Sequence, residues 1–442
     1  MKLILLVGLW VGVGGMGTED LPARIPTLQR LQLERLRAVH EAREVFSGTR
    51  HRPPWAVGLN DYRAVIHAHS FLSHDSRGTW EEITAAAHET GTQVLLMTEH
   101  PAEEYDVLAR ARHGLHEGVL FIPGTEENQL LTFPRTLRYR PPESSRQAHI
   151  NRILADGGLV FIAHPEELTD WNLTDFTGLE IYNIHADFKD ERELLTGLER
   201  LDPKLFLLLL QAERTFPQEM FASLTDVPRD NLRRWDQLNQ RRRVVGIAAN
   251  DAHSNTGFVL KVAEGGKVRV EDILGEDLAL LDPTQVPLLP ALVADKEPGT
   301  EVLRLHLDPY ARSFRHVGTH ILAPELTEED IRAALAAGRC YVSFDWIADA
   351  RGFVLWVEKD DQKWLMGEEV PWQQGLTLRT TLPCPAEIRI VGDGKVVHTV
   401  NGPEATYPLP APGVYRVEVY VTLAGEVWPW IYSNPLRVLP RR

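Results

Sequence analysis

The sequence predicts an α/β protein in which a barrel of parallel strands precedes a smaller all-β region. Short apolar runs alternate with amphipathic segments, which is the pattern of a parallel sheet covered by helices. Several of these runs end in histidines or acids, as strands do where the loops of a parallel barrel converge. From Phe353 onward, short strands alternate with turn pairs such as Asp393-Gly394. We therefore expect the chemistry in the barrel and none in the C-terminal region.

The first candidate strand ends at Ile66 and leads directly into His67 and His69. Residues i and i+2 of a strand point to the same face, so both imidazoles can face one ion. Neutral imidazole is a common ligand for zinc-like metals. The polar loop that follows adds a carboxylate, Asp75, which we prefer as a ligand to its neighbour His74.

Four further apolar runs end in the same chemistry. They are Val94 to Thr98 before Glu99 and His100, Val119 to Ile122 before Glu126, Leu159 to Ala163 before His164, and Val244 to Ala248 before Asp251 and His253. The carboxyl ends of barrel strands lie at one face, so these side chains are expected to converge there.

The remaining elements follow from periodicity and from turn or cap residues. Helices are expected over 26–47, 78–89, 144–155, 231–243 and 331–337, and strands over 179–182, 205–210 and 340–344. The segment 283–298, rich in proline and leucine, is expected to be a linker or a packed excursion.

The ordered motifs resemble those of the PHP (polymerase and histidinol phosphatase) superfamily. They are His67-x-His69, Ser73-x-Asp75, Thr98-Glu99-His100, Gly124-x-Glu126, Ala163-His164-Pro165 and Asn250-Asp251-Ala252-His253. The resemblance covers about residues 58–285 and implies a distorted (β/α)7 TIM-like barrel (the PHP fold), here followed by a small β-sandwich-like domain. Two motifs depart from the family pattern: Glu99 stands where aspartate is usual, and 128–133 lacks the histidine that often follows Gly-x-Glu.

The resemblance implies a metal-dependent phosphoesterase with two or three divalent ions, and the missing histidine favours two. Its metal ligands would be His67, His69, Asp75, His100, Glu126, His164, Asp251 and His253. Histidines mixed with carboxylates suit zinc, manganese or iron better than magnesium or calcium. Such ions lower the pKa of a bound water and clamp the oxygens of an ester, so no protein group beyond that water is assigned a catalytic role.

Residues beside the ligand motifs are candidates to bind the substrate. They are Arg77, Arg135, Ser254 and Asn255, and His185 is a further possible ligand. The favoured function is hydrolysis of a small phosphate ester. Hydrolysis of a carboxylic ester, carbamate or amide on the same fold, and a non-enzymatic binding module, stay open as alternatives. The sequence has no nucleophilic-serine elbow and no glycine-rich phosphate loop.

The N-terminus has the pattern of an export signal, because Lys2 precedes an apolar run that ends near Gly17. We expect a periplasmic or extracellular protein with a signal peptide over 1–17 and a helical segment over 18–57. The barrel would span 58–285, a connecting segment that packs on it 286–344, and the β-sandwich-like domain 345–442.

The overall charge narrows the range of partners. The net charge is −15, which argues against nucleic acid and leaves a small-molecule substrate. The N-terminal apolar run is shorter than a spanning helix requires, so no stable membrane insertion is expected. The two cysteines, Cys340 and Cys384, form a disulfide only if their Cα atoms come within bonding range, which spacing does not decide.

Overall fold

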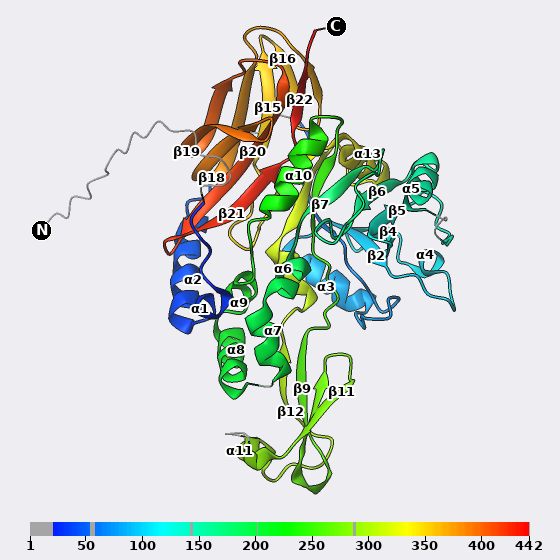
Figure 1. The fold of residues 1–442 in the computed structure, drawn as a ribbon, viewed down its shortest axis with the longest axis vertical. Coiled ribbons are helices and arrows are strands. Elements are labelled where there is room, and N and C mark those ends of the chain that lie inside the picture. Colours follow the sequence, from blue (N-terminus) through cyan, green and yellow to red (C-terminus); the bar gives the residue numbers. More distant parts are fainter. Residues whose placement is uncertain (1–20, 54–57, 142–144, 201, 286–288, 442) are drawn as a thin grey trace, which may run out of the picture.

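A computed structural model describes residues 21–53, 58–141, 145–200, 202–285 and 289–441; the expected signal peptide lies outside these ranges. The central body combines helices with part of a long sheet. The strand-rich C-terminal region lies at one end of the molecule, and a small separate sheet projects from the opposite end (Figure 1). Among the described residues, no helix combines the length and the apolar character needed to cross a bilayer.

Six strands of the body run in one direction. They are β1 (Asn60–Ile66), β2 (Val94–Glu99), β4 (Val119–Glu127), β6 (Leu159–Ile162), β7 (Gly178–Asn183) and β8 (Val245–Ala249). β1, β2 and β4 are neighbours in parallel, as are β6, β7 and β8. β5 (Leu130–Phe133) joins the two sets and is antiparallel to β4 and to β6. The carboxyl ends of all six strands therefore face the same way.

The expected barrel is not confirmed, because the described strands do not close into a ring. β13 (Gly318–Ala323) pairs antiparallel with β1 along residues 60–64 and so occupies the edge that a closing strand would need. β8 meets β1 only beyond that pairing, where Asn250 N donates to Ile66 O and Ala68 bridges to Ala252. The observed fold is a mixed α/β protein with an open sheet.

Helices of the body cover the sheet. α3 (Trp80–Thr90) begins with a capping box between Thr79 and Glu82 and ends at Gly91, whose φ of 66° is the left-handed conformation of a helix end. The other helices expected here are confirmed as α5 (Arg146–Ala155), α10 (Arg229–Asn239) and α13 (Glu328–Ala337). The short elements between them are α4 (Val107–Arg110), β3 (Gly114–His116) and α12 (Tyr310–His316).

Two sequence predictions need correction at the N-terminal helix and at the apolar run 205–210. The expected helix over 26–47 divides into α1 (Thr27–Arg30) and α2 (Leu33–Ser47). The run predicted as a strand belongs to α8 (Pro203–Thr215), because Asp202 caps the helix at Lys204 N and a proline opens it. α8 follows α6 (Ile184–Asp190) and α7 (Arg192–Glu199) and precedes α9 (Pro217–Ala222). α2 packs on α8 and α9, which gives that apolar run its buried face.

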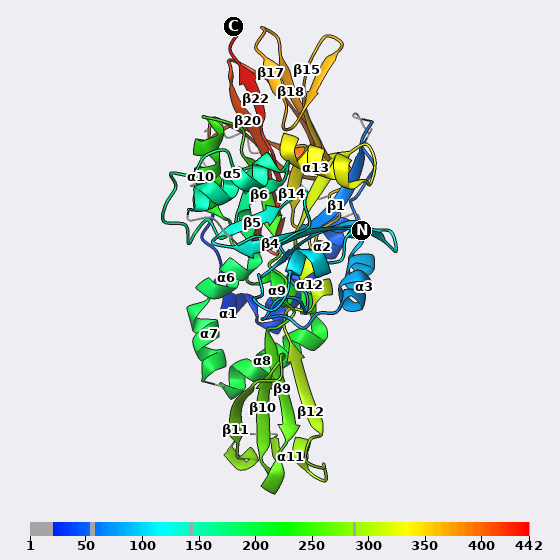
Figure 2. The same cartoon turned by 90° about the vertical axis from the view of Figure 1, so that its right-hand side faces the viewer.

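The projecting sheet is inserted after β8. It contains β9 (Gly257–Val262), β10 (Val268–Asp272), β11 (Asp277–Leu281) and β12 (Glu301–His306), all antiparallel, in the order β11-β10-β9-β12. Figure 2 shows this sheet extending away from the body. Among its described residues, the segment expected as a linker or a packed excursion forms a 3₁₀ turn, Pro283–Gln285, and α11 (Leu289–Val293). Another turn, Glu264–Gly266, joins β9 to β10.

The C-terminal region contains strands and no helix among residues 354–441. Its strands are β15 (Val354–Lys359), β16 (Gln362–Leu365), β17 (Glu369–Pro371), β18 (Thr377–Gly392), β19 (Lys395–Pro408), β20 (Gly413–Leu423), β21 (Glu426–Ser433) and β22 (Leu436–Leu439). β14 (Cys340–Ser343) pairs with both β13 and β21, so one continuous sheet links this region to the body. Cys340 and Cys384 are both buried and free, so the possible disulfide is not formed.

Candidate metal centre

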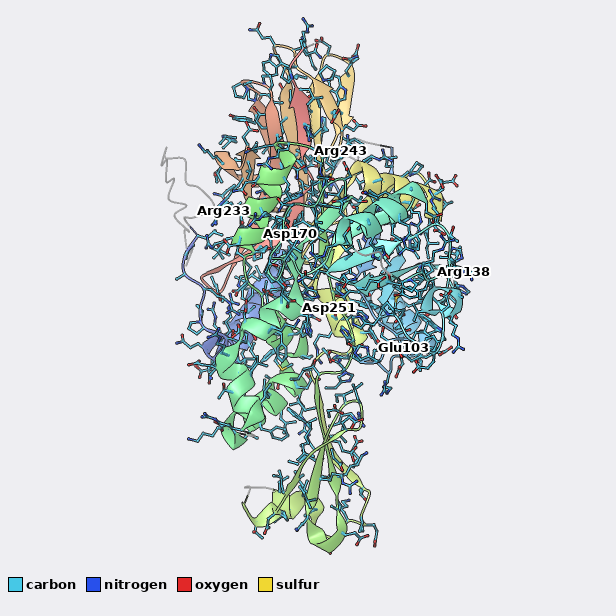
Figure 3. The ribbon with its side chains drawn as sticks, turned by 45° about the vertical axis from the view of Figure 1, so that its right-hand side comes forward. Glu103, Arg138, Asp170, Arg233, Arg243 and Asp251 are labelled. Atoms are coloured by element: carbon cyan, nitrogen blue, oxygen red, sulfur yellow. The ribbon has the colours of Figure 1, made fainter. Side chains whose placement is uncertain are left out.

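The structure brings together all eight residues expected as metal ligands. Each lies at the carboxyl end of a parallel strand or in the loop that follows it, after β1, β2, β4, β6 or β8. Asp251 marks the position in Figure 3, near the centre of the molecule. The convergence arises because parallel strands deliver their carboxyl ends to one face.

The first group of side chains comprises His67, His69, Glu126 and Asp251, which are all buried. Each offers one ligand atom, and these atoms lie within 4.8 Å of one another. His67 Nε2 lies 2.9 Å from Glu126 Oε2 and 3.1 Å from Asp251 Oδ1. His69 Nε2 lies 3.4 Å and 3.5 Å from the same two oxygens. Two imidazoles and two carboxylates therefore point at one small space.

The second group comprises His69, Asp75, His100 and His253, and it shares His69 with the first. Asp75 Oδ2 lies 3.3 Å from His100 Nε2 and 3.2 Å from His253 Nε2. His74, the alternative to Asp75, has a side chain that is 79% exposed, so the aspartate is the member that faces the group.

His164 connects the first group to a third one. Its Nε2 lies 3.2 Å from Glu126 Oε1 and 3.4 Å from Asp251 Oδ2, the outer oxygens of the two carboxylates in the first group. With Glu166 and Glu167 it forms another set whose ligand atoms lie close enough to hold an ion, although both glutamates are on the open side.

The backbone at three of these residues is strained. His67, His164 and Asp251 have φ values of 69°, 46° and 45°, in the left-handed region that side chains with a Cβ rarely adopt. Each such residue costs about 1–3 kcal/mol and persists only where the surrounding structure imposes it. Each of the three residues stands one or two positions after the end of its strand, where the chain turns sharply.

The donor set fits divalent cations. His69 Nε2, Asp75 Oδ1 and Asp251 Oδ1 are buried and have no hydrogen-bond partner. A buried polar atom without a partner costs about 1–3 kcal/mol, and a cation between these atoms would satisfy them. The mixture of imidazole and carboxylate is the donor chemistry of zinc, manganese and iron sites.

The charges of the groups stabilise one another. Burial lowers the pKa of His67, but Asp251, Glu126 and Glu180 raise it well above the usual value. Burial also lowers the pKa of His164 and of His253, but nearby carboxylates outweigh it and raise these pKa values to about 11 and about 9. Conversely, these imidazoles lower the pKa of Asp75, Glu126 and Asp251 despite burial. A cation would therefore take the place of protons on the imidazoles.

Glu180 is a supporting residue that the site prediction did not include. From β7, its Oε1 accepts from His67 Nδ1 at 2.6 Å, and its Oε2 accepts from His164 N at 3.0 Å and from Asn183 Nδ2 at 3.1 Å. A carboxylate on one imidazole nitrogen leaves the other nitrogen, Nε2 of His67, free to bind a cation. The signal in the sequence was an acid inside an apolar strand.

Glu99, the departure from the family motif, also supports the site without joining any of the groups. Its carboxylate accepts from the backbone N and the hydroxyl of Ser70, and from the hydroxyl of Ser73 at 2.8 Å. Ser73 Oγ in turn accepts from His100 N and lies 3.2 Å from His69 Nδ1. The longer side chain thus reaches the loop that carries two of the histidines.

The residues predicted to bind substrate lie in different surroundings. Asn255 Nδ2 donates to Asp75 O and so borders the second group, whereas the exposed Arg77 guanidinium donates to the backbone carbonyls of His74 and Ser76. Ser254 Oγ bonds His306 Nε2 at the base of the projecting sheet. Arg135 pairs with Glu329 of α13 and donates to Gly157 O, and neither partner belongs to the ligand groups.

His185, the further possible ligand, lies beside the groups and not in them. Its ring centroid is 6.0 Å from that of His253, and it comes from the first turn of α6. Burial lowers its pKa, and Asp251 opposes that effect.

The fold and the site together define a mixed α/β protein with a candidate centre for divalent cations. No protein-family model matches the chain, and no curated protein matches it. Among solved structures, the chain is similar to a two-domain protein from Bacteroides vulgatus ATCC 8482 that contains a predicted PHP-like metal-dependent phosphoesterase. The two share 12% identity at a TM-score of 0.36, over 86% of this chain and 97% of that chain.

Proposed function

We propose that this chain is a metal-dependent hydrolase, and specifically a phosphoesterase that acts on a small phosphate ester. The observation that supports the proposal is the pair of ligand groups that share His69 and contain three buried, unpartnered donor atoms. The two adjoining groups together offer seven side chains, more than the about four ligands that one zinc ion usually takes, which favours two neighbouring ions. Six strands run in one direction, and the motifs at their ends resemble those of the PHP superfamily. Both observations support a distant relation to the distorted barrel of that superfamily.

In this proposal one ion would be held by the first group, and the other by Asp75, His100 and His253 of the second group, because His69 would bind one ion only through its Nε2. When bound, such ions supply Lewis acidity to an ester oxygen and lower the pKa of a water. The chain's own residues define the geometry: Glu180 orients His67, and Glu99 with Ser73 fixes the loop that carries His69. His100 and Asp75, both partly exposed, lie on the side from which a substrate reaches the centre.

The test combines metal analysis with two parallel assays. Purified protein loaded with manganese or zinc is assayed against nitrophenyl phosphate and nitrophenyl acetate under the same conditions, and bound metal is counted by mass spectrometry. We expect about two ions per chain and faster hydrolysis of the phosphate. Faster hydrolysis of the acetate would assign the site to acyl chemistry, and folded protein that binds no metal would refute the proposal.

We also propose that the chain is exported. The proposal rests on the N-terminal pattern of Lys2, an apolar run and small residues up to Gly17, in a segment outside the described residues.

A further inference from the structure

An apolar pocket adjoins the candidate metal centre. Its walls come from α6, α7, α8 and α9 and from the loops that carry Asp251 and Asp308. Figure 1 shows these helices grouped beside α1, below the body. The lining is mainly aliphatic and aromatic, and includes Ile184, Phe188, Leu194, Leu209, Met220 and Phe221. Because Asp251 belongs to the first ligand group and also lines the pocket, the pocket opens beside the proposed reaction centre.

Besides Asp251 Oδ1, which belongs to the metal centre, two polar atoms of residues that line the pocket lack hydrogen-bond partners. Asn250 Nδ2 donates to Ser313 O and to Val317 O, but Asn250 Oδ1 is buried without a partner. Ser313 Oγ is also buried without a partner, and both residues line the pocket. Buried polar atoms in folded proteins are nearly always satisfied. An acceptor and a hydroxyl together would suit a ligand group that donates a hydrogen bond.

The size of the pocket limits what can enter. It measures about 60 Å³, and a water needs about 10–15 Å³ of a cavity measured in this way. The pocket therefore holds about four to six water-sized groups. A compact alkyl chain or small ring fits, whereas the remainder of a long lipid chain would have to extend into solvent.

We infer that this pocket selects the substrate, binding a compact apolar group of about four to six heavy atoms attached to the ester that the metal centre hydrolyses. A hydroxyl on that group donates to Asn250 Oδ1 and accepts from the Ser313 hydroxyl. The inference rests on the proposed function and adds the chemical class of the substrate: a phosphate ester of a short apolar alcohol that carries one hydrogen-bond donor.

The experiment measures binding of alkylphosphonates of increasing length to the manganese-loaded protein by isothermal titration calorimetry. The phosphonate group of the probe tests the metal centre, and its alkyl chain tests the pocket. Each buried methylene tightens binding about fourfold, so butylphosphonate is expected to bind about 60-fold more tightly than methylphosphonate. The gain is expected to stop between butyl and hexyl, and decylphosphonate to bind like hexylphosphonate.

Two variants and a matched control locate the effect. Phe188→Ala enlarges the pocket, so the gain in affinity is expected to continue beyond hexyl. Phe206→Ala, on α8, removes the same side chain from a half-buried position that does not line the pocket, and the plateau should not move. Ser313→Ala is expected to weaken binding of 4-hydroxybutylphosphonate about fivefold relative to butylphosphonate, because the ligand hydroxyl loses one of its two partners.

The outcomes separate this inference from the proposed function. Binding of methylphosphonate with no gain from methyl to butyl, or equal plateaus in Phe188→Ala and Phe206→Ala, would overturn the pocket and leave the phosphoesterase intact. If Ser313→Ala leaves the binding of 4-hydroxybutylphosphonate unchanged, the inferred hydrogen-bond donor on the substrate is refuted. Absence of phosphonate binding at any length, together with absence of hydrolysis, would overturn both.

Discussion

Replacing Glu180 by glutamine tests whether the centre depends on a residue that touches no ion itself. The carboxylate accepts three hydrogen bonds, from His67 Nδ1, His164 N and Asn183 Nδ2. Glutamine keeps one acceptor oxygen and adds an NH₂ group. If the NH₂ faces His164 N and Asn183, two buried donors lose their acceptor. If it faces His67, the proton of that imidazole must move to Nε2, the nitrogen that points at Glu126 and Asp251.

Either orientation carries a calculable cost. One buried donor without an acceptor costs about 1–3 kcal/mol, and loss of a carboxylate behind a metal-binding histidine typically weakens metal affinity by about 10–100-fold. We therefore expect Glu180→Gln to raise the dissociation constant for zinc by about 10–100-fold. Competition with a chromogenic chelator at constant pH measures this change.

The chain offers a matched control in Glu219 of α9. It is buried, and its Oε1 lies 2.8 Å from His40 Nδ1, so it repeats the glutamate–histidine pair away from the ligand groups. Glu219→Gln is expected to lower the melting temperature without changing zinc affinity. Zinc binding by Glu180→Gln within twofold of the original chain, or an equal loss in the control, would refute the assigned role of Glu180.

Three further predictions concern two of the expected ligands, a buried histidine and the N-terminus. His67→Ala or Asp251→Ala should remove bound metal and hydrolysis together, whereas His113→Ala, at an exposed residue paired with Glu328, should change neither; metal analysis beside the phosphate assay decides this. Burial disfavours the charged form of His320, but Asp345 and Asp61 raise its pKa to about 10. Because an unfolded histidine titrates near pH 6.5, this stabilisation is complete below that pH and is lost as the pH rises toward 10. Urea unfolding should show a loss of roughly 3 kcal/mol between pH 7 and 10 that His320→Gln abolishes, and equal losses in both proteins would contradict the assignment. Intact-mass measurement of exported protein should place the mature N-terminus near Thr18, and a retained Met1 would exclude cleavage there.

The sequence by itself determined which residues meet at the centre. A ligand directly after a buried parallel strand has its position in space set by the strand, so local order along the chain was sufficient for His67, His100, Glu126, His164 and Asp251. Their role as metal ligands is still a prediction. The alternation of helices and strands was readable for the same reason, since periodicity reports which face of an element is buried.

Tertiary structure decided the features that depend on contacts between distant segments. The run 205–210 is apolar enough for either a strand or a helix; Asp202 and the following proline open a helix there, and packing against α2 and α9 buries its apolar side. β13 lies far along the chain from β1 and yet takes its edge, which leaves the sheet open. The support of His67 by Glu180, and the pocket formed by α6–α9 beside Asp251, likewise join elements whose meeting no local pattern encodes. Local propensity and burial pattern act over a few residues. Closure of a sheet, the hydrogen bond that supports His67, and a pocket between helices depend on contacts between segments far apart in the chain.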